Sequence, residues 1–296
     1  MHSFLKKIFF FLTPVALLAI ALELYVEHIP NSYTYKRSYL EHHAPTIQTL
    51  ILGSSYAYDG ICPSAFDSAF SLANSSQCFE DDYRLLARYI ADMPALQRVI
   101  LPLSYSSLQM VSSSNRRAYY TIYMQLYPRW PISKYSFECF NLSLMSKKII
   151  KHLLHSDLVR CDSLGQRLGH TLESRPLSDW QQTQQLIAND RFLGPAAEPY
   201  VQQNIAWLQQ LAALCLQHDV ELCLVMMPVL DAYRQGMPPE QIALMEHTLH
   251  HLSATHQSVR VLDFQHWGTS ADFFNATHLN TSGSLRFTHH LRSHLD

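Results

Sequence analysis

Residues 46–61 read TIQTLILGSSYAYDGI, and this stretch decides how the rest of the sequence is interpreted. Its apolar run, rich in isoleucine and leucine, has the length of a buried strand and ends abruptly at Gly53-Ser54-Ser55. A strand that ends in Gly-Ser-Ser delivers a hydroxyl group to a turn at the edge of a sheet. We therefore predict a buried strand followed by a turn that presents Ser55, the candidate nucleophile.

A serine nucleophile needs a base, because its hydroxyl stays protonated near neutral pH. The sequence offers His278, which lies in the stretch DFFNATHLNTSG at residues 272–283. Three groups are candidates to orient its ring, namely Asn275, Asp272 and a backbone carbonyl, and we expect Asn275 to be a neutral orienter. An asparagine lacks the charge that stabilises imidazolium, and an Asp-to-Asn exchange at this position of a serine protease costs a factor of about 10⁴ in rate.

Gly53-Ser54-Ser55 and Asn275-Ala276-Thr277-His278 together resemble two blocks of the SGNH (GDSL-type) hydrolase superfamily. Those blocks are Gly-Asp-Ser after the first strand and Asp-x-x-His before the final helix. The Gly-Ser-Ser block and the continuation His278-Leu279-Asn280 are more similar to membrane-anchored branches related to proteins that acylate cell-surface polymers. The resemblance covers residues 46–296 apart from a middle portion. It implies an α/β fold, a three-layer α/β/α sandwich with a parallel, flavodoxin-like sheet of about five strands.

The resemblance also implies an oxyanion hole, built from the Ser55 backbone amide, a second backbone amide and a side-chain donor. Ser76 stands where the family has a glycine, and a backbone N–H survives that replacement. Ser104 stands where the family has an asparagine, and its hydroxyl is a weaker donor. Asn74 is a further candidate for this site.

Apolar runs alternate with helical patterns along the chain, which predicts a parallel sheet covered by helices on both faces. Pro102, inside one predicted strand, indicates a bulge or a sheet edge. Ligands bind beyond the carboxyl ends of the strands in such sheets, where Ser55, Ser76 and Ser104 would lie. The predicted strands after the first are residues 69–73, 98–104, 220–228 and 259–264; the predicted helices are residues 81–92, 201–216, 238–253 and the segment that follows residues 280–282.

The N-terminal residues predict a membrane segment. Lys6 and Lys7 precede the charge-free stretch IFFFLTPVALLAIAL at residues 8–22. A spanning helix needs about 17–25 apolar residues and a signal-peptide core about 7–15, so both an anchor and a signal cleaved after residues 19–21 fit. We favour an uncleaved anchor, because apolar residues continue past Glu23. The lysines then stay cytoplasmic and the remaining chain is exported, to the periplasmic or extracellular face, or secreted if the segment is cleaved.

We divide the chain into an anchor or signal at residues 1–28, a polar linker at residues 29–45 and a hydrolase-like domain at residues 46–296. An insertion at about residues 108–198 interrupts that domain. It is rich in aromatic residues from Arg116 onward, which suit either sugar stacking or packing on the core. Helical patterns cover residues 145–158 and 179–187, and substrate specificity is expected to reside here.

Composition narrows the choice of partners and cofactors. The net charge is −2 and no long basic run occurs, so nucleic acid is not an expected partner. No Cys-x-x-Cys pair occurs, and His247 and His251 share a helix face without an acidic partner motif, so no metal or other cofactor is expected. Cys62 and Cys78 follow the first two strands, and the sequence leaves their pairing open.

We therefore expect an exported, membrane-anchored enzyme that forms an acyl-Ser55 intermediate on ester-linked acyl groups, above all acetyl groups, of a cell-surface or extracellular polysaccharide. Hydrolysis and O-acyl transfer share this intermediate, and both stay open. The partners are the ester-bearing polysaccharide, the membrane through the N-terminal helix and, as a candidate, a membrane acyl-donor protein. The alternative is a non-catalytic carbohydrate-binding or assembly protein on a degraded SGNH scaffold, for which Asn275, Ser71 and Ser76 count as departures from the family blocks.

Overall fold

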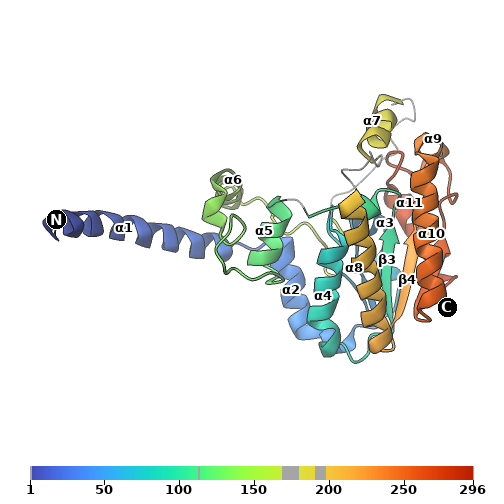
Figure 1. Cartoon of the computed structure of the whole chain (residues 1–296), viewed down its shortest axis with the longest axis horizontal. Coiled ribbons are helices and arrows are strands. Elements are labelled where there is room, and N and C mark those ends of the chain that lie inside the picture. The colour runs from blue at the N-terminus through green and yellow to red at the C-terminus, as the bar shows by residue number, and fades with distance from the viewer. Residues whose placement is uncertain (1, 113, 169–179, 191–197, 296) are drawn as a thin grey trace. The chain divides into compact units, whose positions relative to one another are not determined.

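The computed structural model describes residues 2–112, 114–168, 180–190 and 198–295 (Figure 1). Internal contacts divide the chain into two compact units. The sheet unit comprises Tyr39–Ser112 and Cys161–Asp296, and the N-terminal unit comprises Met1–Ser38 and Ser113–Arg160.

The sheet unit is built on five parallel strands in the order β2-β1-β3-β4-β5. This is the flavodoxin-like strand order, and it confirms the predicted α/β fold with a five-stranded parallel sheet. The strands are β1 (Thr49–Ile51), β2 (Ala69–Ser71), β3 (Arg98–Leu103), β4 (Glu221–Met226) and β5 (Val259–Asp263).

The strands are apolar because helices cover both faces of a parallel sheet. Leu50, Ile100 and Leu224, on three adjacent strands, are fully buried. Helix α4 packs against α8, which packs against α10, while α3 packs against α11. The helices of the sheet unit are α3 (Ser55–Gly60), α4 (Phe79–Tyr89), α7 (Trp180–Asp190), α8 (Glu198–Gln217), α9 (Asp231–Gly236), α10 (Pro239–Thr255) and α11 (Thr281–Arg292), with 3-10 turns η1 (Ala44–Thr46), η2 (Pro63–Ala65), η3 (Ile90–Asp92), η4 (Ser107–Gln109) and η6 (Ser270–Asp272).

Pro102 does not mark a bulge or an edge, because β3 is the central strand and Pro102 pairs in register with Val225 of β4. The reason lies in the short neighbour β1, which ends at Ile51 opposite Ile100. The Ile100 carbonyl accepts from Leu52 N at 3.0 Å and so faces β1. Alternate residues of a strand face the same neighbour, so the missing N–H of Pro102 points past the end of β1 and costs no ladder bond.

The N-terminal unit contains the long helix α1 (His2–Glu27), which extends away from α5 (Ser114–Ile122) and α6 (Leu142–Leu153) (Figure 1). A 3-10 turn, η5 (Glu138–Phe140), contacts α1. Within Lys6–Glu27, an 18-residue window has a mean hydropathy of 2.2 and only 6% of it is buried, so this helix is long and apolar enough to cross a membrane.

Residues 29–45, predicted to be a polar linker, contain helix α2 (Ser32–His43). The start signal is Asn31, whose side-chain oxygen accepts from Tyr33 N at 2.9 Å and Thr34 N at 3.2 Å. The polar sequence did not indicate that this helix has a buried side, because that side includes a lysine: Lys36 is fully buried together with Leu40.

The region expected as one insertion, residues 108–198, is divided between the two units. Ser113–Arg160 joins the N-terminal unit, whereas the described residues 161–168 and helix α7 belong to the sheet unit. Helix α6 begins at Leu142 and ends at Leu153, earlier at both ends than predicted. Asp179, the predicted start of the next helix, lies outside the described residues.

Candidate active site

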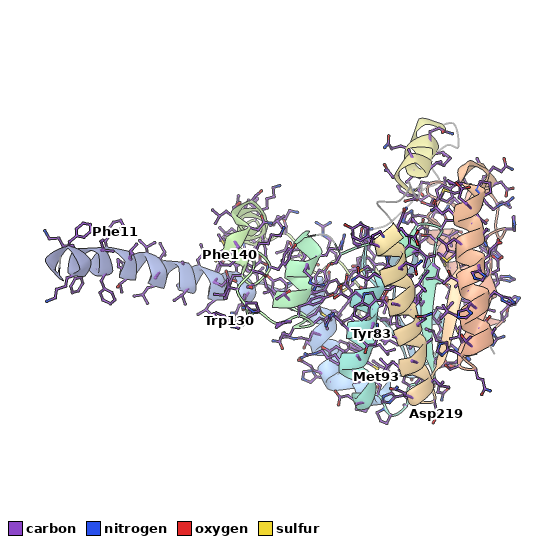
Figure 2. All side chains as sticks on the ribbon, viewed as in Figure 1. Phe11, Tyr83, Met93, Trp130, Phe140 and Asp219 are labelled. Atoms are coloured by element: carbon purple, nitrogen blue, oxygen red, sulfur yellow. The ribbon has the colours of Figure 1, made fainter. Side chains whose placement is uncertain are left out.

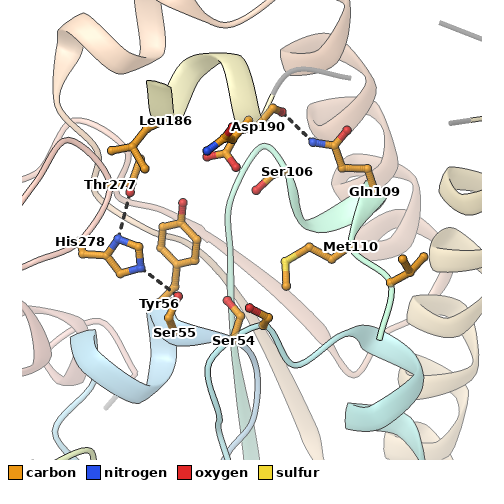
Figure 3. Close-up of a pocket in the computed structure, with 13 residues that line it drawn as sticks. Ser54, Ser55, Tyr56, Ser106, Gln109, Met110, Leu186, Asp190, Thr277 and His278 are labelled. Atoms are coloured by element: carbon orange, nitrogen blue, oxygen red, sulfur yellow. Dashed lines mark hydrogen bonds between the residues drawn. The ribbon is translucent and has the colours of Figure 1, made fainter. Parts of the chain in front are cut away.

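The structure brings Ser55 and His278 together although 223 residues separate them (Figure 3). Ser55 is the first residue of α3, directly after β1, and His278 lies in the loop between η6 and α11. Ser55 Oγ lies 2.8 Å from His278 Nε2. This is hydrogen-bond distance between a hydroxyl and the nitrogen that would take its proton.

The turn that presents Ser55 depends on Gly53, whose φ of +106° lies in a region that residues with a side chain rarely adopt. Its carbonyl accepts from Asn74 N at 3.2 Å, which links the turn after β1 to the turn after β2. Its N–H donates to Asp82 Oδ1 at 2.8 Å. The position of Ser55 is therefore fixed by two contacts from residues 74–82.

The other nitrogen of the imidazole is held by two polar neighbours. His278 Nδ1 lies 2.9 Å from Thr277 Oγ1 and 3.3 Å from Asn275 Oδ1. The oxygen of an amide only accepts hydrogen bonds, so Nδ1 carries the proton in a contact with Asn275. Nε2 is then unprotonated and free to accept from Ser55. The network therefore favours the tautomer that a general base requires.

Asn275 is itself held in place by the backbone that follows it. Its Oδ1 accepts from Thr277 N at 3.0 Å and from His278 N at 2.9 Å. It also lies 3.2 Å from Thr277 Oγ1, which can donate to it. Thr277 thus accepts from the imidazole and donates to the asparagine, forming a neutral relay behind the ring.

Asp272, the alternative orienter, is placed elsewhere. Its Oδ2 accepts from Thr269 N at 2.8 Å and Thr269 Oγ1 at 3.1 Å, and its Oδ1 accepts from Arg286. Burial acts to raise the pKa of Asp272, but these hydrogen bonds and the Arg286 charge lower it overall. Asp272 therefore links the loop at Thr269 to Arg286 of α11, and both oxygens of its carboxylate accept hydrogen bonds from these two residues.

Tyr56 forms one wall of the site and was missed by sequence reasoning. Its ring stacks on the His278 ring, with centroids 4.9 Å apart and planes 14° from parallel. Burial raises the pKa of this phenol, and the neighbouring hydroxyl groups of Ser104, Thr277 and Tyr233 act to lower it by a smaller amount. Tyr56 therefore stays neutral and limits how far the imidazole can turn.

These residues line a cavity of about 450 Å³ beyond the carboxyl ends of the strands (Figure 3). Part of its lining is apolar and part is polar, which suits a ligand that carries both an acyl group and hydroxyl groups. The lining residues are Ser54, Ser55, Tyr56, Ser76, Ser106, Gln109, Met110, Val111, Leu186, Asn189, Asp190, Thr277 and His278.

The candidate oxyanion donors differ in where the structure places them. The Ser55 N–H lies at the start of α3, where a helix leaves its first N–H groups without intrahelical partners. Ser76 lines the cavity and has a φ of +55°. Ser104 is buried outside the cavity lining, with its Oγ 3.1 Å from that of Ser106. Asn74 turns away, since its Nδ2 donates to Leu72 O at 3.3 Å.

Asp82 ties the turn at Ser55 to the turn at Ser76. Its Oδ1 accepts from Gly53 N at 2.8 Å and from Gln77 Nε2 at 2.6 Å. Its Oδ2 is buried and has no hydrogen-bond partner within the described residues. Burial raises the pKa of Asp82 to about 7. No sequence pattern indicates this role, because Asp82 follows two other acids in the first turn of α4.

A second carboxyl group, Asp190, faces the cavity from the end of α7 (Figure 3). Its Oδ2 accepts from Tyr233 Oη at 2.7 Å. Its backbone carbonyl accepts from Gln109 Nε2 and Gln241 Nε2, both at 2.7 Å. Burial raises the pKa of Asp190. These contacts fix a carboxyl group in the wall of the cavity.

Metal ligands and disulfides do not contribute within the part of the chain that the structure describes. It contains no group of three or more His, Cys, Asp or Glu side chains that would hold a metal ion. All six cysteines are free thiols in this part, and the Sγ atoms of Cys62 and Cys78 contact Ser284 and Asp81 respectively. His247 and His251 are exposed on α10.

A solved structure from Streptococcus pneumonia, provisionally assigned as a platelet activating factor, is similar over 96% of this chain and 98% of its own, with a TM-score of 0.44 and 9% sequence identity. Neither a protein-family description nor a curated protein matches this sequence.

Proposed function

We propose that this chain is a serine-dependent enzyme that cleaves or transfers ester-linked acyl groups through an acyl-Ser55 intermediate. The observation that carries this proposal is the 2.8 Å contact between Ser55 Oγ and His278 Nε2, with Nδ1 of the same ring held by Thr277 and Asn275. The resemblance of the Gly53-Ser54-Ser55 and Asn275–His278 blocks to SGNH hydrolases supports the same chemistry.

In the first half of the reaction, His278 Nε2 takes the proton of the Ser55 hydroxyl while Oγ attacks the ester carbonyl carbon. The carbonyl oxygen becomes an oxyanion, for which the backbone N–H groups of Ser55 and Ser76 are the candidate donors. The C–O bond to the leaving alcohol then breaks, and that alcohol takes the proton from the imidazolium. An acyl-Ser55 ester remains.

In the second half, a hydroxyl compound loses its proton to Nε2 and attacks the acyl carbon, and Ser55 recovers its proton as it leaves. Water as the attacking compound gives hydrolysis, and a sugar hydroxyl gives O-acyl transfer. The imidazolium that forms twice in each cycle meets the neutral dipoles of Thr277 and Asn275 at Nδ1. This arrangement stabilises the charge less than an aspartate would, and predicts slower turnover.

The polar wall of the cavity favours a substrate rich in hydroxyl groups. Asp190, Asn189, Ser106 and Gln109 line it together with the apolar Met110. A carboxylate accepts hydrogen bonds from hydroxyl groups, as in many sugar-binding sites. Together with the apolar helix α1 and the resemblance to anchored branches, this supports an acetyl ester of a cell-surface or extracellular polysaccharide, with the site exported.

Incubation of the full chain with an acetyl-ester donor and an oligosaccharide tests the proposal. Release of acetate alone indicates hydrolysis, and acetylated sugar indicates transfer. Ser55→Ala is expected to abolish both products. Ser54→Ala is the matched control, because Ser54 lines the same cavity and its side chain makes no capping bond at α3. Full activity in Ser55→Ala would sink the serine mechanism.

One observation favours a second candidate, a non-catalytic carbohydrate-binding or assembly protein. The residue three positions before His278 is the neutral Asn275, and Asp272 is engaged by Thr269 and Arg286 instead. Binding of an oligosaccharide that is unchanged by Ser55→Ala, with no product from wild type, would support this candidate over the enzyme.

A further inference from the structure

The C-terminal end of α1 is built into the N-terminal unit. The carboxylate of Glu23 is 7% exposed and accepts from the backbone N–H groups of Glu138 at 2.7 Å and Cys139 at 2.8 Å. Lys148 Nζ donates to the carbonyl of Val26 at 2.9 Å. The charge and the last turn of this helix are therefore satisfied by protein groups, and the helix enters the unit at a fixed place.

The charge-free part of α1 is short for a membrane. Residues 8–22 give 15 positions, which at 1.5 Å per residue span about 22 Å. The hydrocarbon core of a bilayer is about 30 Å thick. Beyond Glu23, whose carboxylate is bound by protein N–H groups, Leu24 and Tyr25 are exposed and extend the apolar surface of α1 at its C-terminal end.

Exposed apolar side chains occur in the same unit around that end of the helix. Figure 2 shows Trp130 and Phe140 on opposite sides of the C-terminal end of α1. Groups of large apolar side chains are seldom exposed on a protein surface unless they form an interaction surface. We call this group the collar, and its members with their exposed fractions are Trp130 75%, Ile132 55%, Phe140 51%, Leu142 66%, Leu153 64% and Leu154 71%.

Two contacts place collar residues at the level where the charge-free stretch ends. Phe140 directly follows Cys139, whose N–H is bound to Glu23. Leu153 directly follows His152, whose ring lies 6.2 Å from the ring of Tyr25. Phe140 and Leu153 therefore lie near residues 23–25 of α1, which directly follow its charge-free stretch.

The charge around the collar is positive, although the chain as a whole carries −2. Residues 128–154 contain five lysines and arginines against one acid, Glu138. Glu138 is buried with Lys148, at 3.4 Å. Lys134, Lys147 and Lys151 are exposed between the apolar residues. A surface with tryptophan, phenylalanine and leucine beside lysines matches the boundary between acyl chains and anionic headgroups.

We propose that the collar is a membrane-contact surface that inserts into the headgroup and acyl boundary of the leaflet from which α1 emerges. Its apolar side chains continue the exposed apolar surface of α1 at the C-terminal end of the helix. Lys134, Lys147 and Lys151 meet the phosphate groups of anionic lipids. Positive charge and continuity with α1 favour a lipid surface over a protein partner, since Phe140 and Leu153 directly follow residues that contact α1 near its C-terminal end.

The test uses the full chain in nanodiscs that contain phosphatidylglycerol and phosphatidylcholine with brominated acyl chains. Bromine quenches tryptophan fluorescence only within the bilayer. The other tryptophans, Trp180, Trp207 and Trp267, belong to the sheet unit and remain in Trp130→Phe. We expect wild type to lose more fluorescence to the brominated lipids than Trp130→Phe does. Equal quenched fractions in the two proteins would overturn the proposal.

Two further measurements identify what covers Trp130 if lipid does not. Quenching of the Trp130 signal by aqueous iodide would show a surface open to water, and protection from both quenchers would show a protein contact; each overturns the proposal. Leu154→Asp is expected to reduce quenching of Trp130 by the lipids. Leu285→Asp is the matched control, because Leu285 is 47% exposed on α11 in the sheet unit.

Discussion

The hydroxyl of Thr277 lies 2.9 Å from Nδ1 of His278 and 3.2 Å from the side-chain oxygen of Asn275. A threonine hydroxyl both accepts and donates, so it can donate to the asparagine and accept from the imidazole, and in this way hold the ring in one orientation. The Ser55 side of the ring is thereby left as an acceptor. In this account a neutral chain of hydrogen bonds replaces the carboxylate that usually orients a catalytic histidine.

Thr277→Val tests this relay with a side chain of nearly the same shape. It removes one hydrogen bond at Nδ1, which contributes about 1 kcal/mol and corresponds to roughly a five- to tenfold change in rate. We expect kcat for an acetyl ester to fall by about that factor, while Thr277→Ser retains activity. Steady-state kinetics of the three proteins decide the matter, and a Thr277→Val enzyme with wild-type kcat would show that the relay has no role.

Asn275→Asp places a carboxylate where the neutral oxygen now accepts from Thr277 N and His278 N. A negative charge near Nδ1 favours the protonated imidazole and raises the pKa of His278. We expect a higher kcat, up to about 10⁴-fold, and an acidic limb of the pH–rate profile that moves to higher pH. An unchanged profile and unchanged kcat would mean that position 275 does not act on the base.

Asp82→Asn tests the buried carboxyl that joins the turns at Ser55 and Ser76. The pKa of Asp82 is raised to about 7 in the folded protein, so its contribution to stability is complete below the unfolded pKa of about 3.9 and is lost as pH rises towards 7. Asparagine keeps the oxygen that accepts from Gly53 and Gln77 but does not titrate. We expect urea unfolding of wild type, but not of Asp82→Asn, to show this loss, which is at most about 4 kcal/mol.

A matching pH dependence in wild type and Asp82→Asn would assign the titration to another group. Asp82→Ala provides a second measurement, because it leaves the buried N–H of Gly53 without its acceptor. Such a group costs about 1–3 kcal/mol. We expect lower stability together with a lower kcat, since the turn that carries Ser55 loses its tie to residue 77.

Asp190→Asn tests the polar wall of the cavity. If the carboxylate accepts from hydroxyl groups of a sugar, its loss removes a hydrogen bond to a charged group of about 1.5–3 kcal/mol. We expect KM for the acceptor to rise about tenfold or more, with a smaller change in kcat. Asn189→Ala is the neighbouring control in the same wall. A changed kcat at constant KM would instead place Asp190 in the chemical step.

The sheet was predictable from the sequence because β1 to β4 are buried on both faces and so appear as continuous apolar runs, such as the one that ends at Ile51. The pairing of Ser55 with His278 followed from two short blocks at the ends of those elements. Asp82 and Asp190 were not predictable, since each acquires its role through a contact with a residue distant in sequence, Gly53 for Asp82 and Tyr233 for Asp190. Helix α2 was also not predicted, because its fully buried side includes a lysine, Lys36.

Labelling of the full chain with a fluorophosphonate tests most directly that Ser55 is activated by His278. Such a probe reacts with a serine whose proton is accepted by a base and leaves an ordinary hydroxyl unmodified. The account predicts labelling of wild type and of Ser54→Ala, and loss of labelling in Ser55→Ala and His278→Ala. A folded wild-type protein that takes up no label, or a Ser55→Ala protein that is still labelled, would contradict it.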